Sequence, residues 1–387
     1  MSAAAPAIQL REGRFARLEA IQWWKQSLLR DARVLVAGAG ALGNEVIKNL
    51  ALLGAGHVVV IDMDRIELSN LSRSVLFRAA DEGKSKAECS AHAAKNIYPD
   101  IDVHPINANL LADVGLGYFR WAQVVIGALD NREARVFLNS ACARVGRPWI
   151  DGGIEVLQGI VRGFHPPKTA CYECTMSAVD WDLLNKRRSC SLLARRALEQ
   201  RGTPTTSTTA SIIGAIQVQE AIKLLHGMDG LIGRGFVFEG AGHNSYTTNY
   251  PINPDCPWHE EPTEIVVLSD VDSATPLKII ADAARAQLGG FDTFDLSREL
   301  VEQLECPACK RIEPIWKPIE HVSESQARCA CGAERVPQFV HSIPSGSALF
   351  AKSPCELGLP KWDIIWARHG MEMIGFEIAG DNPFTGA

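Results

Sequence analysis

Short runs of consecutive apolar residues alternate, along the first half of the chain, with longer stretches in which apolar residues recur at helical spacing. Residues 33–38 and 57–61 predict two buried strands, and the apolar positions at 46, 47, 50 and 53 predict a helix between them. Further strands are expected at 102–107, 122–129 and 148–151, with helical stretches between them. This alternation predicts an α/β fold with a doubly wound, largely parallel sheet.

The second half of the chain is organised differently. A Ser- and Thr-rich stretch over 203–211 precedes a helical pattern over 212–225, which Gly227 ends. We expect a first domain over 1–262 and a C-terminal region over 263–387. The C-terminal region has a short strand–helix pattern, a cysteine-bearing segment and mixed strands, which together predict a smaller α+β unit.

Composition narrows the class of protein. Hydrophobic residues make up 47% of the 387 residues and charged residues 22%, which favours two or three globular domains over disorder. The net charge of −6 argues against a nucleic-acid binder. No apolar run approaches the roughly 18 residues of a membrane span, and the first residues lack a signal-peptide pattern. We therefore expect a cytoplasmic protein with no membrane or nucleic-acid partner.

Gly38, Gly40 and Gly43 form a G-x-G-x-x-G motif between the first predicted strand and the following helix. Such glycines let the backbone turn tightly and approach a phosphate, whose charge the helix N-terminus attracts. Asp62, at the end of the next strand, is placed to accept hydrogen bonds from a ribose. A tight turn without a ligand is the alternative, but the strand–helix–strand context favours a nucleotide site.

Charged and amide side chains follow the ends of the second and fourth predicted strands. They are Asp64, Asn70, Arg73, Lys86, Asp130 and Arg135. Because the carboxyl ends of parallel strands meet at one sheet edge, we expect these residues to gather where ligands bind. Cations together with an acid suit a nucleoside triphosphate and its Mg²⁺ better than a nicotinamide dinucleotide.

With these motifs in place, residues 11–262 resemble the ubiquitin-activating-enzyme family, which includes the sulphur-carrier adenylyltransferases of molybdopterin and thiamine synthesis. The resemblance rests on the segments 38–77, 83–88, 128–135, 171–174 and 208–225. It implies binding of Mg·ATP and attack on the α-phosphate by the C-terminal carboxylate of a small ubiquitin-like protein that ends in Gly. The products would be an acyl-adenylate and pyrophosphate.

The resemblance also implies residue roles. The three motif glycines would form the nucleotide loop, Asp62 would bind the ribose, and Asp130 would place Mg²⁺. The residues that would hold the triphosphate are Asn70, Arg73 and Lys86, and Asp64 is assigned to the same ATP site. Family members are dimeric, and an N-terminal arginine can reach the ATP of the partner subunit. We favour Arg17 for this role, with Arg14 as the second choice.

Eight residues have the spacing of metal ligands. Cys171 and Cys174 form a C-x-x-C pair, and Cys256 and His259 form a C-x-x-H pair; together they offer four ligands for Zn²⁺. The resembling family supports this pairing, although its usual second half is C-x-x-C. A second set, resembling a zinc ribbon, consists of Cys306, Cys309, Cys329 and Cys331. We expect two structural Zn²⁺ ions, with unligated thiols as the alternative.

Cys190 is the candidate nucleophile among the remaining cysteines. Cys89 and Cys142 lie within predicted helices, where packing explains them, and Cys355 has no recognisable chemical neighbours. Cys190 lies in the strongly basic stretch 186–201, and nearby cations favour a thiolate. The catalytic cysteine of the resembling family also lies in this crossover segment. An ordinary cysteine beside a basic helix is the alternative.

The predicted function is an ATP-dependent enzyme that adenylates a ubiquitin-like protein and then carries it as a thioester on Cys190, from which a conjugating enzyme could accept it. One alternative is a sulphur-carrier adenylyltransferase that forms no thioester. A second is a binding protein that retains the fold without the chemistry. An oxidoreductase has no support beyond the glycine motif.

Overall fold

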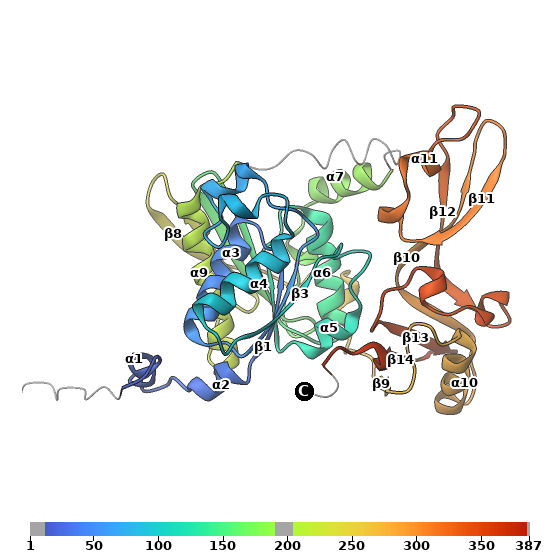
Figure 1. Ribbon diagram of the computed structural model, residues 1–387. Helices are drawn as coiled ribbons and strands as arrows, with labels where there is room; N and C mark the ends of the chain where they lie inside the picture. The colour runs from blue at the N-terminus through green and yellow to red at the C-terminus, as the bar shows by residue number, and fades with distance from the viewer. Residues whose placement is uncertain (1–11, 190–203, 385–387) are drawn as a thin grey trace, which may run out of the picture.

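The computed structural model describes residues 12–189 and 204–384, which form two β-sheets with helices packed around them (Figure 1). The larger sheet has the strand order β3-β2-β1-β4-β5-β6-β7-β8. Its strands are β1 (Arg33–Ala37), β2 (His57–Ile61), β3 (Asp102–Ile106), β4 (Val124–Gly127), β5 (Trp149–Glu155), β6 (Gln158–Phe164), β7 (Arg234–Glu239) and β8 (Asn244–Asn249). The pairs from β3 to β5 are parallel, and those from β5 to β8 are antiparallel.

Helices cover both faces of the parallel part, which explains why β1 and β2 are apolar at consecutive positions. One face is covered by α3 (Ala41–Leu53), α4 (Lys86–Ile97) and α9 (Ser207–Leu225). The other face is covered by α5 (Leu116–Trp121) and α6 (Arg132–Arg144). Val34 and Val36 point to the first face, and Leu35 and Ala37 to the second. The predicted doubly wound fold is confirmed.

The start of α9 differs from the sequence expectation. The helix begins at Ser207, not at 212, so the second half of the Ser- and Thr-rich stretch is its first turn. The Thr206 side chain accepts a hydrogen bond from the backbone N–H of Thr209, and Thr209 itself is buried. Serine and threonine caps favour helix starts, and here one such cap extends the helix backwards.

Among the described residues of the first two-thirds of the chain, the structure has three further α-helices: α1 (Ala16–Glu19), α2 (Gln26–Arg30) and α7 (Ala178–Ser189). The cysteines expected inside helices are there, Cys89 in α4 and Cys142 in α6. Among the residues that the structure describes, no helix is long and apolar enough to cross a membrane.

The C-terminal region forms the smaller sheet, with the order β11-β10-β13-β14-β9 and with β12 paired to β10. Its elements are β9 (Ile265–Leu268), α10 (Leu277–Leu288), β10 (Thr293–Glu305), β11 (Ile312–Lys317), α11 (Glu324–Ala327), β12 (Val336–Pro344), β13 (Ile364–His369) and β14 (Glu372–Ile378). Helix α10 packs on this sheet, and the far end of β10 with β11 and β12 projects as a separate lobe (orange in Figure 1).

The two sheets are joined by a buried contact surface. Ile364 and Trp366 of β13 belong to the same apolar cluster as α5 and α6. Trp362 lies so close to Gly115 and Gly117 that a side chain at either glycine would collide with it. The buried guanidinium of Arg298 donates to the carbonyls of the loop before α5. The C-terminal region is therefore packed against the first domain rather than tethered to it.

Candidate functional site

The carboxyl edge of the larger sheet contains the point where strand order reverses. Strand β1 lies between β2 and β4, so the chain leaves β1 towards one side and returns to its other side at β4. Doubly wound sheets bind ligands in the crevice beyond such a point. The residues that follow these three strands are Gly38, Asp62 and the 128–130 segment, as the sequence motifs predicted.

Two of the three motif glycines are required by close backbone contacts, and the third faces free space. Gly38 has a φ of +98° and lies against the backbone of Ala128, so it tolerates no side chain. Gly43 lies against the Gly38 carbonyl with the same result. Gly40, immediately before α3, has no atom within 4 Å of the place where a Cβ would lie. The N-terminus of α3 is therefore accessible to an anionic group, and this geometry fits a nucleotide phosphate.

Asn44 is a site residue that the sequence analysis missed. Its buried side chain donates to the carbonyl of Ala39 at 2.8 Å and to that of Gly40 at 3.0 Å. Its Oδ1 accepts from the backbone N–H of Leu76 at 2.9 Å. Asn44 thereby holds the glycine loop against the segment that carries Arg73. A polar amide at the start of an otherwise apolar helix was the available signal.

Asp62 is fixed beside the glycine loop. Its carboxylate accepts hydrogen bonds from the backbone N–H groups of Ala39 at 2.7 Å and Asp64 at 2.8 Å. Burial raises the pKa of Asp62, and the ammonium of Lys86 acts in the opposite direction. The carboxylate thus joins the ends of β1 and β2 and lies at the position predicted for a ribose contact.

Lys86 and Asp64 form an ion pair at the same edge. The ammonium of Lys86 lies 2.8 Å from Asp64 Oδ2, and the Lys86 backbone N–H donates to the Asp64 carbonyl at 3.0 Å. Only 13% of the Lys86 side chain is exposed, against 55% for Asp64. The cation is therefore held in place by a carboxylate that solvent or a ligand can reach.

Asn70 lies within the helical turn Leu68–Ser72, which follows β2, and Arg73 is the residue directly after that turn. Asn70 is buried, and its Oδ1 accepts from the backbone N–H of Glu67 at 3.0 Å, so the amide first stabilises its own turn. Arg73 is half-buried and donates to the Ser69 carbonyl at 2.8 Å. That bond uses one of its five N–H donors, which leaves others for an anion.

Asp130 follows β4 and is exposed, with one carboxylate oxygen 3.0 Å from the Asn131 amide. Arg135, on the helix that follows, is held by buried partners of its own. It pairs with the fully buried Asp151 at 2.8 Å and donates to the carbonyls of Leu129 and Gly152 at 2.6 and 2.9 Å. Arg135 therefore braces the backbone that carries Asp130.

Cys171, Cys174, Cys256 and His259 come together as one cluster whose four ligand atoms lie within 4.8 Å of one another. The Sγ atom of Cys171 is 3.7 Å from that of Cys174 and 3.5 Å from that of Cys256. Tetrahedral Zn²⁺ with Zn–S bonds of about 2.3 Å separates its sulphurs by about 3.8 Å, so the set fits zinc. The Nε2 atom of His259 faces the Cys174 sulphur, and its Nδ1 atom lies 3.5 Å from the Pro167 carbonyl, which can orient the ring.

Cys306, Cys309, Cys329 and Cys331 form the second cluster, at the tip of the projecting lobe. The Cys306–Cys331 and Cys309–Cys329 sulphur separations are both 3.5 Å. The single spacer residue between Cys329 and Cys331 therefore does not prevent the four thiols from converging. The apolar cluster beneath them contains only Val301, Leu304 and Val322 as fully buried members, so a metal ion would supply much of the local stability.

The two candidate arginines near the N-terminus differ in their contacts. Arg14 donates to the Ile97 carbonyl, and its guanidinium lies 5.1 Å from the centre of the Tyr98 ring. Arg17, on α1, is exposed and makes no hydrogen bond or ion pair within the described ranges. Cys190, the candidate nucleophile, lies outside the described residues.

Comparison with known proteins decides the family. Residues 13–257 match the model of the ThiF family, which covers more than half of the chain. The chain belongs to the ThiF family. Its resemblance to the ubiquitin-activating-enzyme family is confirmed by relatives that are named as E1 activating enzymes.

Two relatives of this ThiF-family chain illustrate the similarity. A Haloferax volcanii protein named SAMP-activating enzyme E1 is 33% identical over 239 residues, which cover 60% of this chain and 82% of that protein. The NEDD8-activating enzyme E1 catalytic subunit of Dictyostelium discoideum is 38% identical over 164 residues, which cover 39% of this chain and 37% of that protein. The chain thus spans little more than a third of the second relative.

Among solved structures, a crystal structure of E. coli MccB with ATP superimposes with a TM-score of 0.54 at 22% identity. The match covers 65% of this ThiF-family chain and 74% of that one. At this identity the likeness concerns the fold alone, and it agrees with the α/β architecture described above.

Proposed function

We propose that this chain is an ATP-dependent activating enzyme for a ubiquitin-like protein that ends in Gly. The observation that carries the proposal is the gathering of an open Gly40 backbone, Asp62, Lys86 and Asp130 at one sheet edge of a ThiF-family chain. Relatives named as activating enzymes for SAMP, NEDD8 and SUMO support the same reaction class.

The first step is adenylation. The C-terminal carboxylate of the carrier attacks the α-phosphorus of ATP, and pyrophosphate leaves with the electrons of the broken bond. Such a transfer depends on positioning and on neutralising charge. The N-terminus of α3, Lys86 and Arg73 would hold the triphosphate, Asp62 the ribose, and Asp130 a Mg²⁺ ion. Because Lys86 already pairs with Asp64, the triphosphate would share or replace an existing anionic partner.

The second step would place the carrier on Cys190. Its thiolate attacks the acyl carbonyl, AMP leaves, and the resulting thioester is passed to a conjugating enzyme. The basic stretch around Cys190 supports this role, since nearby cations favour the thiolate. If no thioester forms, the adenylate would instead be used by a sulphur donor.

We further propose a cytoplasmic homodimer in which Arg17 reaches the ATP of the partner subunit. The support is that Arg17 is exposed and uncommitted within the described residues, whereas Arg14 contacts Ile97 and Tyr98 of its own chain. The two cysteine clusters are assigned to structural Zn²⁺, because each offers four closed protein ligands.

The first test is ATP–pyrophosphate exchange with the cognate carrier protein, using Asp130→Ala. We expect a loss of about a hundredfold or more, the magnitude typical of removing one charge-stabilising group. Asp102→Ala is the matched control. Asp102 is an exposed acid at the first residue of β3, at the sheet edge opposite the nucleotide edge, so its loss should leave exchange unchanged. Exchange by Asp130→Ala at the rate of the Asp102→Ala control would remove Asp130 from the active site.

The second test separates the two steps. Cys190→Ala should retain pyrophosphate exchange, because adenylation uses no thiol, and should lose the thiol-sensitive enzyme–carrier band on a nonreducing gel. Cys355→Ala is the control, since Cys355 is an exposed cysteine outside the two clusters, and this variant should keep the band. A band that persists in Cys190→Ala would place the nucleophile elsewhere. Exchange without any band in the unmodified enzyme would favour the sulphur-carrier reaction.

A further inference from the structure

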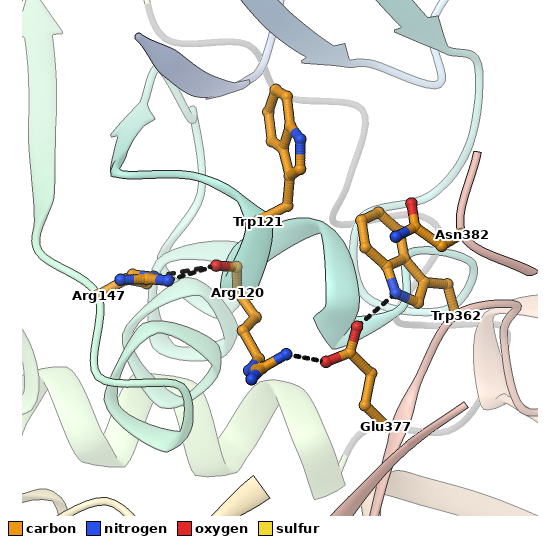
Figure 2. A pocket seen from close by; sticks show the side chains of 6 residues that line it. All are labelled: Arg120, Trp121, Arg147, Trp362, Glu377 and Asn382. Atoms are coloured by element: carbon orange, nitrogen blue, oxygen red, sulfur yellow. Dashed lines mark hydrogen bonds and ion pairs between the residues drawn. The ribbon is translucent and has the colours of Figure 1, made fainter. Parts of the chain in front are cut away.

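A pocket of about 260 Å³ lies where the first domain meets the C-terminal region (Figure 2). Its lining residues are Arg120, Trp121, Arg147, Trp362, Glu377 and Asn382. The first three come from the end of α5 and from the loop after α6, and the other three from the C-terminal region. Neither the nucleotide edge nor the two cysteine clusters contribute to it.

The pocket is at the opposite end of the sheet from the glycine motif. Arg33, the first residue of β1, donates to the Trp121 carbonyl at 2.9 Å, whereas Gly38 follows the last residue of the same strand. A five-residue strand is about 17 Å long at 3.3 Å per residue. A ligand in this pocket would therefore bind without touching ATP.

Positive charge exceeds negative charge around the pocket. Two guanidinium groups line the pocket, those of Arg120 and Arg147, and Arg33 is close enough for its charge to act on Arg147, whereas Glu377 supplies the one carboxylate among the lining residues. That carboxylate is already engaged, since one oxygen pairs with Arg120 and the other accepts from the Trp362 indole at 2.6 Å. In the ranges 12–189 and 204–384, no carboxylate oxygen lies within 4.0 Å of Arg33 or Arg147.

Backbone carbonyl groups accept only some of the hydrogen bonds that Arg33 and Arg147 can donate. Arg147 donates through two nitrogens to the Arg120 carbonyl, at 3.1 and 2.7 Å, so it also caps the end of α5. Burial lowers the pKa of Arg147, and the like charges of Arg120 and Arg33 add to the effect. The carboxylate of nearby Asp381 accepts from the Ser273 backbone N–H. A guanidinium has five N–H donors, so Arg147 retains donors beyond those that cap α5.

Aromatic rings form the other walls. Trp121 stacks on Phe384 with ring centres 4.6 Å apart, and Trp362 meets the same Phe384 at 5.8 Å and Tyr118 at 4.8 Å. Flat apolar surfaces beside cations favour a ligand with both a ring and a negative group. The volume is below the roughly 300–1,000 Å³ of pockets for drug-sized ligands, which limits the occupant to about one ring.

We propose that this pocket binds a small organic anion, a single flat ring that bears one carboxylate or phosphate. Arg147 supplies the charge for the anionic group, beside the Arg120–Glu377 ion pair, and the half-buried Trp121 supplies the surface for the ring. Because the lining comes from both parts of the chain, the bound anion also strengthens their association. The site is independent of the adenylation reaction proposed above.

The test is isothermal titration of the full chain with four probes: benzoate, phenyl phosphate, benzamide and inorganic phosphate. We expect at least one ring-bearing anion to bind with a Kd of about 1 mM or tighter. The neutral benzamide and the ringless phosphate should bind at least about tenfold more weakly. The comparison of benzoate with phenyl phosphate distinguishes a carboxylate ligand from a phosphate ligand.

Arg147→Gln should weaken binding of the preferred probe about tenfold or more, as expected for loss of a charged hydrogen-bond donor. Arg234→Gln is the matched control, an exposed arginine that also donates to a backbone carbonyl, that of Gly230, and it should change nothing. If Arg147→Gln does not fold, Trp121→Leu tests the ring wall and should weaken the same probe. Failure of all four probes to bind, equal binding of benzamide, or unchanged affinity in the variants would overturn the proposal.

Discussion

Arg298 connects the two parts of the chain through a buried charge, and its removal gives a measurable prediction. Its guanidinium donates to the carbonyls of Leu111 at 2.8 Å and Val114 at 2.9 Å. It also lies 3.8 Å from Asp363, and the two side chains are 5% and 0% exposed. Asp363 in turn accepts from the Leu116 backbone N–H at 2.9 Å. The perturbation we consider is Arg298→Met, which fills similar space without charge.

Arg298→Met should lower the free energy of unfolding, because it leaves the buried Asp363 carboxylate without its cation. Removing one partner of a buried ion pair costs about 3–5 kcal/mol, because the other charge remains buried without its ionic partner. Burial lowers the pKa of Arg298, and the nearby carboxylate of Asp363 opposes that effect. In the double variant Arg298→Met, Asp363→Asn, the stranded charge is gone. Its loss of stability should therefore be smaller than the sum of the two single losses by at least about 1 kcal/mol.

The assay is urea unfolding of each variant, with limited proteolysis to locate the first region that opens. Arg285→Met is the control, because Arg285 pairs with Asp282 on the surface, where both side chains are about half exposed, and should cost less than about 0.5 kcal/mol. The reasoning is refuted if Arg298→Met costs no more than this control. Strict additivity in the double variant would equally refute it.

Three further predictions concern the glycine loop, the metal centres and a buried acid. Gly38→Ala should cost about 1–3 kcal/mol in unfolding free energy, since φ is +98° and Ala128 blocks the space, whereas Gly40→Ala should keep the stability and weaken only ATP binding, measured by calorimetry. Elemental analysis should find about two Zn²⁺ per chain, and Cys306→Ser should lose one while ATP binding persists. Burial alone would raise the pKa of Asp151, but Arg135 and Arg162 hold it below its usual value. The ionised Asp151 therefore stabilises the folded state fully above its ordinary pKa of about 3.9, and this stabilisation is lost as the pH falls through the lower folded-state pKa. In acid denaturation, the difference in unfolding free energy between the native chain and Asp151→Asn should narrow below about pH 4.

The nucleotide edge could be predicted from sequence because its signals are local. A strand, a glycine loop and a helix are consecutive in the chain, and strand order then brings the ends of β1, β2 and β4 together. The two cysteine clusters could also be predicted from sequence, since each half of a cluster is a short motif. Arg135 shows the limit of such reasoning. Its place after Asp130 grouped it with the charged residues at the ligand edge, but the partner that determines its position, Asp151, lies on another strand.

The packing of the C-terminal region could not be predicted from any local pattern. Arg298 reaches carbonyls that precede it by more than 180 residues, and Trp362 contacts Gly115 and Gly117 across a similar separation. In the sequence these two glycines resemble ordinary turn residues. Only the assembled structure shows that Gly117 makes room for the indole ring of Trp362, and Gly115 for the backbone of Lys361 and Trp362.

The same packing connects the C-terminal region to the cluster of Cys171, Cys174, Cys256 and His259. Trp258 lies between the ligands Cys256 and His259, and the guanidinium of Arg144 is 5.7 Å from its ring and 4.7 Å from that of Trp366 in β13. The Trp258 indole also donates to Glu173, which lies between the other two ligands, Cys171 and Cys174. Since both halves of the metal cluster position Trp258, a metal ion bound there would also order the surface on which β13 packs. A metal ion at this cluster would therefore stabilise more than its own four ligands, whereas one at the tip of the projecting lobe would act within that lobe.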